Sequence, residues 1–269
     1  MRTILHLSDL HFGRVNLRLV DPLLKRVDEI RPDLVAVSGD LTQRARSRQF
    51  QEAREFLDAL PQPQIVVPGN HDVPLHNPFT RFLQPLDKFR RYITDDLQPS
   101  YVDSEIAVVG VNTARSLTIK GGRINEAQVE RVKEILCSHS EAVIKAIVTH
   151  HPFDLPEGYD DRDLVGRARM AMSGLSGCGA DLFLAGHLHV AHTNHTAIRY
   201  PIKGYAALII QAGTAISTRE RGEANSFNVV RIQPAEVEVQ RYEWQPQASE
   251  FALAAREHFQ QTNDGWSRI

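Results

Sequence analysis

Short apolar runs alternate with helical patterns along the first two thirds of the chain. Runs such as Leu34–Ser38 and Val143–Thr149 are mainly apolar and rich in β-branched residues, which is typical of strands buried on both faces. Between the runs, apolar residues recur every three or four positions, as in Leu17–Ile30 and Gln49–Leu60. The alternation predicts strand-helix-strand units and a mostly parallel sheet. The predicted strands are Thr3–Leu7, Leu34–Ser38, Gln64–Val67, Ile106–Val111, Val143–Thr149 and Asp181–Ala185.

Two further helices are predicted in the middle of the chain. Pro78–Tyr92 has apolar residues at helical spacing, and we expect Pro85 to kink this helix or to split it in two. Asn125, with Gln128 three residues later, resembles a capping box, which predicts a helix from there to about Cys137.

The pattern becomes β-rich in the last third of the chain. Ala206–Gln211, Ser226–Ile232 and Val237–Tyr242 are predicted strands, and a short turn joins the last two. The spacing in Ala248–Gln260 predicts a terminal helix. We expect residues 1–269 to form a single domain whose C-terminal portion is β-rich from about residue 205.

Composition and charge narrow the class of protein. The chain has 269 residues, of which 42% are hydrophobic and 24% charged, as is ordinary for a soluble globular protein. Its formal net charge is −2, whereas proteins that hold nucleic acid by its phosphates usually carry a strong basic excess, so no nucleic-acid partner is expected. No apolar run approaches the roughly 18 residues of a membrane span, and the N-terminus lacks the apolar segment of a secretory signal.

The chain has two cysteines, Cys137 and Cys178, which form no CxxC pair. We expect both to be buried small hydrophobic residues, neither metal ligands nor part of a disulfide framework. Their scarcity fits a reducing compartment, so a cytoplasmic protein is expected. The sequence favours no particular oligomeric state.

Five short polar blocks begin where predicted buried strands end. In an open α/β sheet the carboxyl ends of the strands border one crevice, so residues far apart in sequence are expected to converge there. The blocks are Asp9-Leu10-His11, Gly39-Asp40, Gly69-Asn70-His71-Asp72, His150-His151 and Gly186-His187-Leu188-His189.

The residue types of these blocks are those of a metal centre. Asp, His and Asn supply oxygen and nitrogen ligands without a thiolate, and such a set suits manganese, iron, zinc or cobalt better than a structural Cys-type zinc site. Seven ligand residues, with one carboxylate shared, would make two four-ligand metal sites with open positions for water and substrate.

Taken together, the blocks resemble the calcineurin-like metallophosphoesterases, whose pattern is D-x-H, GD, GNH[DE], H and GHxH. All five are present here in order, and the resemblance spans roughly residues 3–215. It implies a four-layer αββα sandwich with two divalent or mixed-valence metal ions between the sheet edges. The residues implied for one metal are Asp9, His11, Asp40 and His189. Those implied for the other are the bridging Asp40, Asn70, His150 and His187.

The resemblance also implies roles for the residues around the metals. His71 would stabilise the phosphoryl oxygens and help to protonate the leaving group, and Asp72 would orient His71 from behind. Arg14 and Arg115 are candidate phosphate contacts because guanidinium suits bidentate binding of phosphate. Arg219 and Arg221 are weaker candidates, since most arginines are surface residues.

The function implied is hydrolysis of a phosphoester, in which a metal-bound hydroxide attacks phosphorus in line. The chain resembles bacterial cyclic AMP phosphodiesterases most, so we expect a small-molecule substrate that is a cyclic nucleotide or a similar small phosphodiester. One alternative is a nucleotide-lipid pyrophosphatase of the UDP-diacylglucosamine type, with an acyl-chain slot formed by Phe79–Phe89 and Met170–Leu175. Another is a nuclease, although such nucleases usually carry extra binding regions that this length hardly accommodates. The last is a binding scaffold of the same fold, which the complete ligand set disfavours.

Overall fold

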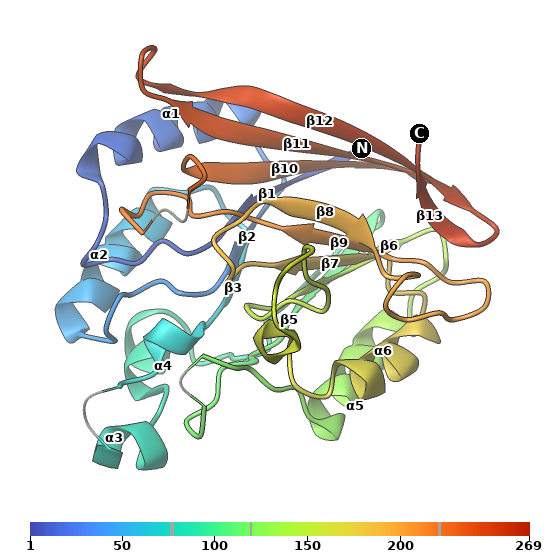
Figure 1. The fold of residues 1–269 in the computed structure, drawn as a ribbon, viewed down its shortest axis with the longest axis horizontal. Coiled ribbons are helices and arrows are strands. Elements are labelled where there is room, and N and C mark those ends of the chain that lie inside the picture. The colour runs from blue at the N-terminus through green and yellow to red at the C-terminus, as the bar shows by residue number, and fades with distance from the viewer. Residues whose placement is uncertain (76–77, 119, 220–221) are drawn as a thin grey trace.

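The computed structural model describes residues 1–75, 78–118, 120–219 and 222–269, and they form two β-sheets packed face to face with helices outside (Figure 1). One sheet contains β1 (Arg2–Leu7), β2 (Leu34–Ser38), β3 (Gln64–Val67), β10 (Ser226–Gln233), β11 (Glu236–Gln245), β12 (Glu250–Thr262) and β13 (Gly265–Arg268). Its order in the described ranges is β13-β12-β11-β10-β1-β2-β3. The other contains β4 (Ser100–Val102), β5 (Ile106–Gly110), β6 (Ile144–Val148), β7 (Leu182–Ala185), β8 (His192–His195) and β9 (Leu208–Gln211). Its order is β4-β5-β6-β7-β9-β8.

The described α-helices are α1 (Val20–Ile30), α2 (Ser47–Asp58), α3 (Pro78–Leu83), α4 (Asp87–Tyr92), α5 (Glu126–Leu136) and α6 (Ala168–Ser176). All of these helices except α3 pack against the outer face of one of the two sheets. The described residues also form three short 3-10 helices, namely η1 (Leu17–Leu19), η2 (Asn70–Asp72) and η3 (Asp161–Asp163). None of the helices in the described ranges has the length and hydropathy that a membrane span requires.

The central strands β1, β2, β5, β6 and β7 are buried on both faces, which explains their almost continuous apolar character. In β1, Ile4 belongs to the core between the two sheets, whereas Leu5 and Leu7 belong to the core beneath α1 and α2. In β6, Ile144 lies between the sheets and Ile147 packs beneath α5 and α6. Three apolar cores therefore separate four layers, which confirms the predicted αββα sandwich.

The predicted mostly parallel pairing is confirmed for the strands that lead to the polar blocks. β1, β2 and β3 pair in parallel, as do β5, β6, β7 and β9. β1 also pairs with β10 in antiparallel fashion, with Leu5 opposite Val229, so the N-terminal strand is central in its sheet. The predicted capping box of Asn125 and Gln128 starts α5, and the predicted interruption at Pro85 separates α3 from α4.

The predicted terminal helix is wrong, because Ala248–Gln260 falls largely within β12. Its alanines, leucine and glutamate favour a helix by intrinsic propensity, but pairing with β11 along the strand overrides that preference. Arg241 pairs with Ala255 and Tyr242 with Leu253, so Ala254 is an extra residue in a β-bulge. At the bulge, the side chains of β12 switch between the two faces of the sheet out of step. The alternation of apolar and polar residues that is typical of a strand is therefore interrupted.

The expectation for the cysteines is also wrong, because Cys137 and Cys178 form a disulfide. Cys137 ends α5 and Cys178 follows α6, and these two helices pack side by side on the second sheet. Only Cys178 is buried. Because the two cysteines form a disulfide, their scarcity no longer supports a reducing compartment.

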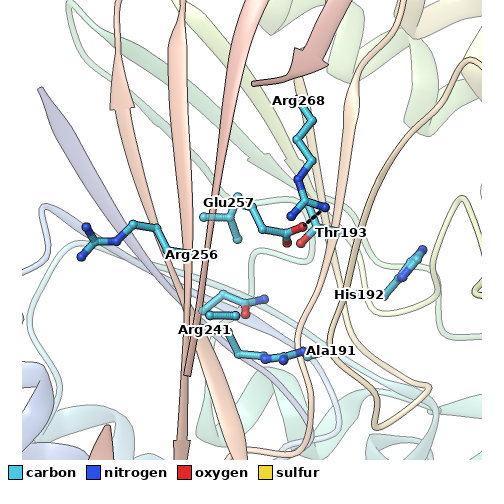
Figure 2. Close-up of a pocket in the computed structure, with 10 residues that line it drawn as sticks. Ala191, His192, Thr193, Arg241, Arg256, Glu257 and Arg268 are labelled. Atoms are coloured by element: carbon cyan, nitrogen blue, oxygen red, sulfur yellow. Dashed lines mark ion pairs between the residues drawn. The ribbon is translucent and has the colours of Figure 1, made fainter. Parts of the chain in front are cut away.

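The C-terminal strands face β8 across a cavity of about 280 Å³ (Figure 2). Arg241, Arg256 and Arg268 line it, and Arg268 pairs with Glu257 at 3.0 Å. None of the predicted site residues lines this cavity.

Replacing both Cys137 and Cys178 by serine should lower the free energy of unfolding by roughly 2–4 kcal/mol, because the cross-link restricts the unfolded chain. Urea denaturation of oxidised protein measures the change, and the same protein treated with reductant should match the variant. Finding two free thiols by titration of the non-reduced, denatured protein would contradict the disulfide.

Candidate metal centre

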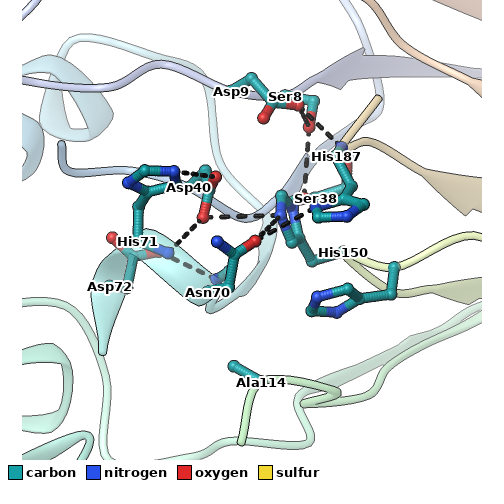
Figure 3. A network of polar contacts seen from close by, with 12 residues as sticks. Ser8, Asp9, Ser38, Asp40, Asn70, His71, Asp72, Ala114, His150 and His187 are labelled. Atoms are coloured by element: carbon teal, nitrogen blue, oxygen red, sulfur yellow. Dashed lines mark hydrogen bonds and ion pairs between the residues drawn. The ribbon is translucent and has the colours of Figure 1, made fainter. Parts of the chain in front are cut away.

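The polar blocks converge at the carboxyl ends of the central strands of both sheets. Asp9 follows β1, Asp40 follows β2 and Asn70 follows β3, all in the first sheet. His150 follows β6 and His187 follows β7 in the second sheet. Figure 3 shows Asp9, Asp40, Asn70, His150 and His187 drawn together by a network of polar contacts. The site therefore forms only where the two sheets meet.

Strained backbone is concentrated at these strand ends. Five of the seven predicted ligands have positive φ, a region that residues other than glycine rarely adopt. They are Asp9 (54°), His11 (49°), Asp40 (52°), His187 (76°) and His189 (62°). Such strain persists only where surrounding structure enforces it, and it is typical of functional sites.

Two glycines in the blocks allow the chain segments to approach closely. A Cβ at Gly69 would overlap the carboxylate of Asp40, and a Cβ at Gly186 would overlap Ser8 and Asp9. The glycines of the GNHD and GHLH blocks are thus required by the packing of one block against another.

Asp9, His11 and His189 form the first half of the cluster, and all three are buried. Oδ1 of Asp9 lies 3.5 Å from Nε2 of His11 and 3.3 Å from Nε2 of His189. The two imidazole nitrogens are 3.3 Å apart. Three potential ligand atoms therefore converge on one point.

Asp40, Asn70, His150 and His187 form the second half. Oδ1 of Asp40 lies 3.5 Å from Nε2 of His150, while its Oδ2 lies 3.7 Å from Nε2 of His11. Oδ1 of Asn70 is 3.2 Å from Nε2 of His150 and 3.1 Å from Nδ1 of His187. Asp40 thus faces both halves, one carboxylate oxygen to each.

Hydrogen bonds behind the imidazoles fix which nitrogen faces the cluster. Nδ1 of His150 donates to the carbonyl of Ser38 at 2.7 Å, and Nδ1 of His189 donates to the carbonyl of Arg219 at 3.0 Å. A neutral imidazole held in this way presents the lone pair of Nε2 to a metal. Oδ1 of Asp9 is buried and accepts no hydrogen bond from any described residue. These inward-facing acceptors fit a cation.

The electrostatics of the cluster also favour positive charge at its centre. Burial lowers the pKa of His150, but the neighbouring Asp40 more than offsets this and raises that pKa to about 9. Although burial opposes ionisation of Asp40, His150 holds the pKa of Asp40 well below its usual range. The buried carboxylates thus hold a cation, either a proton or a metal ion, and metal binding would release the proton.

His151 lies beside His150 and His187 but is already engaged through both ring nitrogens. Nε2 donates to the carbonyl of Lys120 at 2.8 Å, so Nδ1 accepts from the hydroxyl of Thr113 at 2.8 Å. Burial and the neighbouring imidazoles hold the pKa of His151 well below its usual range. His151 therefore supports the loop that carries Lys120.

His71 lies at the edge of the cluster with both ring nitrogens assigned. Nδ1 donates to the carbonyl of Gln43 at 3.0 Å, and Nε2 accepts from Nη1 of Arg219 at 2.8 Å. Nε2 is also 4.0 Å from Oδ2 of Asp40. Burial lowers the pKa of His71, which favours the neutral imidazole.

The expectation that Asp72 orients His71 is wrong, because Gln43 occupies that position. The carboxylate of Asp72 instead accepts from the backbone amides of Leu41, Thr42 and Gly69 at 2.8–3.1 Å, and from the hydroxyl of Thr42 at 2.9 Å. The 3-10 turn η2 directs this carboxylate back toward the start of its own loop. Burial and Asp40 raise the pKa of Asp72 to about 6.

The arginine candidates have separate surroundings. Arg14 is exposed, and its backbone carbonyl accepts from the amide of Thr218 at 2.8 Å. Nη2 of Arg115 donates to Gln128 on α5 at 2.6 Å, outside the Asp-His cluster. Arg219, the weaker candidate, contacts His71 directly. Arg221 lies outside the described residues.

Several supporting residues were not predicted. Ser38 directly precedes the Gly39-Asp40 block, and Gln43 lies three residues after Asp40. Thr214, which contacts Nδ1 of His189 at 2.8 Å, follows β9. Because Thr214 follows the carboxyl end of a parallel strand, the rule that located the five blocks would also have found it.

Replacing Asp72 by alanine should lower the free energy of unfolding by at least about 2 kcal/mol, since several buried donors would lose their acceptor. Urea denaturation at neutral pH measures this, with the exposed Asp87→Ala on α4 as the control. Equal stability of the two variants would show that the carboxylate does not hold the loops together.

Replacing His151 by alanine should leave the metal content of the purified protein unchanged, whereas His150→Ala should reduce it. The reason is that both nitrogens of His151 are already bonded within the protein. Elemental analysis of protein reconstituted with Mn²⁺ measures both. Equal metal loss in the two variants would make His151 a ligand.

Comparison with known proteins agrees with this geometry. Residues 2–191, more than half of the chain, match the family described as calcineurin-like phosphoesterase. A glycerophosphodiester phosphodiesterase, GpdQ of Enterobacter lignolyticus (strain SCF1), is 34% identical over 122 residues, which cover 38% of this chain and 43% of that protein. The match thus spans less than half of that relative.

Solved structures show the same fold at low sequence identity. A dimetal phosphatase from Danio rerio has a TM-score of 0.64 and 15% identity, covering 94% of this chain and 98% of that one. The purple acid phosphatase PPD1 from yellow lupin has a TM-score of 0.69 and 11% identity, covering 95% of this chain and 53% of that one. With the family match over residues 2–191, the chain belongs to the calcineurin-like phosphoesterase family.

Proposed function

We propose that this phosphoesterase is a phosphodiesterase with a dinuclear metal centre that acts on cyclic nucleotides or similar small phosphodiesters. The observation that carries the proposal is the position of Asp40, whose two carboxylate oxygens face His11 and His150 in different halves of the cluster. A carboxylate placed in this way can bridge two adjacent cations, the arrangement of a two-metal site. The similarity to a glycerophosphodiester phosphodiesterase supports a diester as the substrate.

The ligand roles in this proposal follow the two halves of the cluster. Asp9, His11, Asp40 and His189 hold one ion, and Asp40, Asn70, His150 and His187 hold the other. This oxygen and nitrogen set suits manganese, iron, zinc or cobalt. When bound, two such ions supply an activated water nucleophile and neutralise charge on the phosphoryl oxygens.

His71 and Arg219 act on the substrate beside the ions. Because the carbonyl of Gln43 fixes Nδ1–H of His71, Nε2 is the nitrogen that can hold a proton at the leaving oxygen. The guanidinium of Arg219 donates a hydrogen bond to Nε2 of His71 in this structure. It is therefore close enough to bind a phosphoryl oxygen of a substrate that lies beside His71. Asp72 contributes indirectly by holding the loops of Asp40 and Asn70 together.

A second candidate is the nucleotide-lipid pyrophosphatase, and exposed apolar side chains favour it. Phe79, Phe82 and Leu83 of α3 are 55–69% exposed, while Arg81 of the same helix is buried and donates to the carbonyls of Pro74 and Thr118. The apolar side of α3 therefore faces outward. The proposed slot at Met170–Leu175 is wrong, because Met172 and Leu175 of α6 are buried in the helix-sheet core.

With Mn²⁺, the protein should hydrolyse bis-p-nitrophenyl phosphate faster than p-nitrophenyl phosphate, and chelation should abolish both activities. Asp40→Ala should lose bound metal as well as rate, whereas His71→Ala should keep its metal and lose about 10²–10⁴-fold in rate, the usual contribution of acid–base help. Release of p-nitrophenol and elemental analysis measure these outcomes.

Three results would count against the proposal. Unchanged metal content in Asp40→Ala would reject the bridging role, and a preference for the monoester would reject the diester. No turnover of either ester by metal-loaded protein, together with cleavage of a nucleotide diphosphate lipid, would favour the second candidate.

A further inference from the structure

A cavity of about 130 Å³ opens directly beside the metal cluster. Two of its lining residues, Asn70 and His71, belong to the site already described. His71 is the residue that we assign to the leaving oxygen. The leaving alcohol of a bound substrate would therefore lie in or next to this cavity.

The cavity is cationic. Arg44, Lys120 and Arg219 line it, and none of the described residues that line it is a carboxylate. Elsewhere in the molecule, partly buried arginines such as Arg2 and Arg199 pair with aspartate at 2.6–2.7 Å. Within the described ranges, no ion pair involves Arg44 or Lys120, and both are exposed to solvent.

The three cations come from separate loops that are each anchored near the metal cluster. The backbone amide of Arg44 donates to the side chain of Gln49 at 2.9 Å. Arg44 directly follows Gln43, whose carbonyl accepts the hydrogen bond from His71. The carbonyl of Lys120 accepts from the buried His151 at 2.8 Å. Anchored backbones keep the positive side chains at the cavity mouth, so less ordering is needed when an anion binds.

The other residues that line the cavity indicate what kind of chemical group would carry the bound anion. Val73 and Leu75 supply apolar surface, and Gln43 is neutral. The cavity thus combines three positive side chains with a short apolar wall. A compact organic group that bears an anion matches both parts.

We propose that Arg44 and Lys120 bind a second anionic group on the leaving alcohol, so that the preferred substrates are phosphodiesters whose leaving alcohol carries a further carboxylate or phosphate. This rests on the proposed phosphodiesterase function. Arg219 borders both places, because it lines the cavity and contacts His71. Arg44 and Lys120 determine which diester is chosen, and their polar contacts within the described part of the chain are made by backbone atoms, with Gln49 and His151.

The test compares two diesters of the same shape, methyl 4-carboxyphenyl phosphate and methyl 4-carbamoylphenyl phosphate. The wild-type protein with Mn²⁺ should favour the acid in kcat/KM by about tenfold, the usual effect of one charge-assisted hydrogen bond. Chromatography of the released phenol measures each rate. Lys120→Gln and Arg44→Gln should each reduce the preference severalfold, leave turnover of the amide unchanged and keep the wild-type melting temperature.

Lys25→Gln is the matched control, because Lys25 is exposed on α1 and does not line the cavity. It should retain the full preference. Equal kcat/KM for the two diesters in the wild type would overturn the inference, as would a preference that persists undiminished in both variants.

Failure of the proposed function gives a different result. If metal-loaded protein hydrolyses neither diester, calorimetry of the same two compounds with that protein decides the role of the cavity. Tighter binding of the acid that is lost in Lys120→Gln and Arg44→Gln would uphold the anion site without the activity. Equal affinities would reject the anion site too.

Discussion

A buried carboxylate at the junction of two sheets is the constraint on which the rest of the site depends. Asp40 is 1% exposed, and a charge removed from water needs close compensation. His11 and His150 provide it from opposite sides, and the amide of His71 donates to Oδ1 at 2.8 Å. Because these groups belong to three separate loops, the charge of Asp40 fixes the loops relative to one another.

The sandwich supplies the rigidity that this arrangement needs. β1, β2, β6 and β7 are buried on both faces, so the residues that follow them cannot shift without disturbing a packed core. The left-handed backbone at Asp9, Asp40 and His187 is the local cost of turning each side chain inward. Asp72 offsets part of that cost by accepting backbone hydrogen bonds from two of the loops.

The sequence was sufficient to predict the layers and the polar cluster because both depend on local patterns. Apolar runs mark strands buried on both faces, and the blocks stand directly after them. The prediction that Asp72 orients His71 is wrong because it relied on their being adjacent in sequence. The geometry of η2 instead brings His71 to the carbonyl of Gln43. β12 was mistaken because its helix-forming composition is overridden by pairing with β11. The disulfide depends on the packing of α5 against α6, which no local pattern records.

The central position of β1 has a consequence for the order of folding. Leu5 pairs with Val35 on one side and with Val229 on the other, so one edge of β1 stays open until the strand near residue 230 is available. Contacts that span more than two hundred residues form late, since a long loop must close first. During synthesis, the strand that leads to Asp9 and His11 is made well before β10, and it is enclosed only when β10 is available. The earliest part of the site to be translated is therefore among the last to be secured, and the nascent chain exposes an apolar strand edge in the meantime.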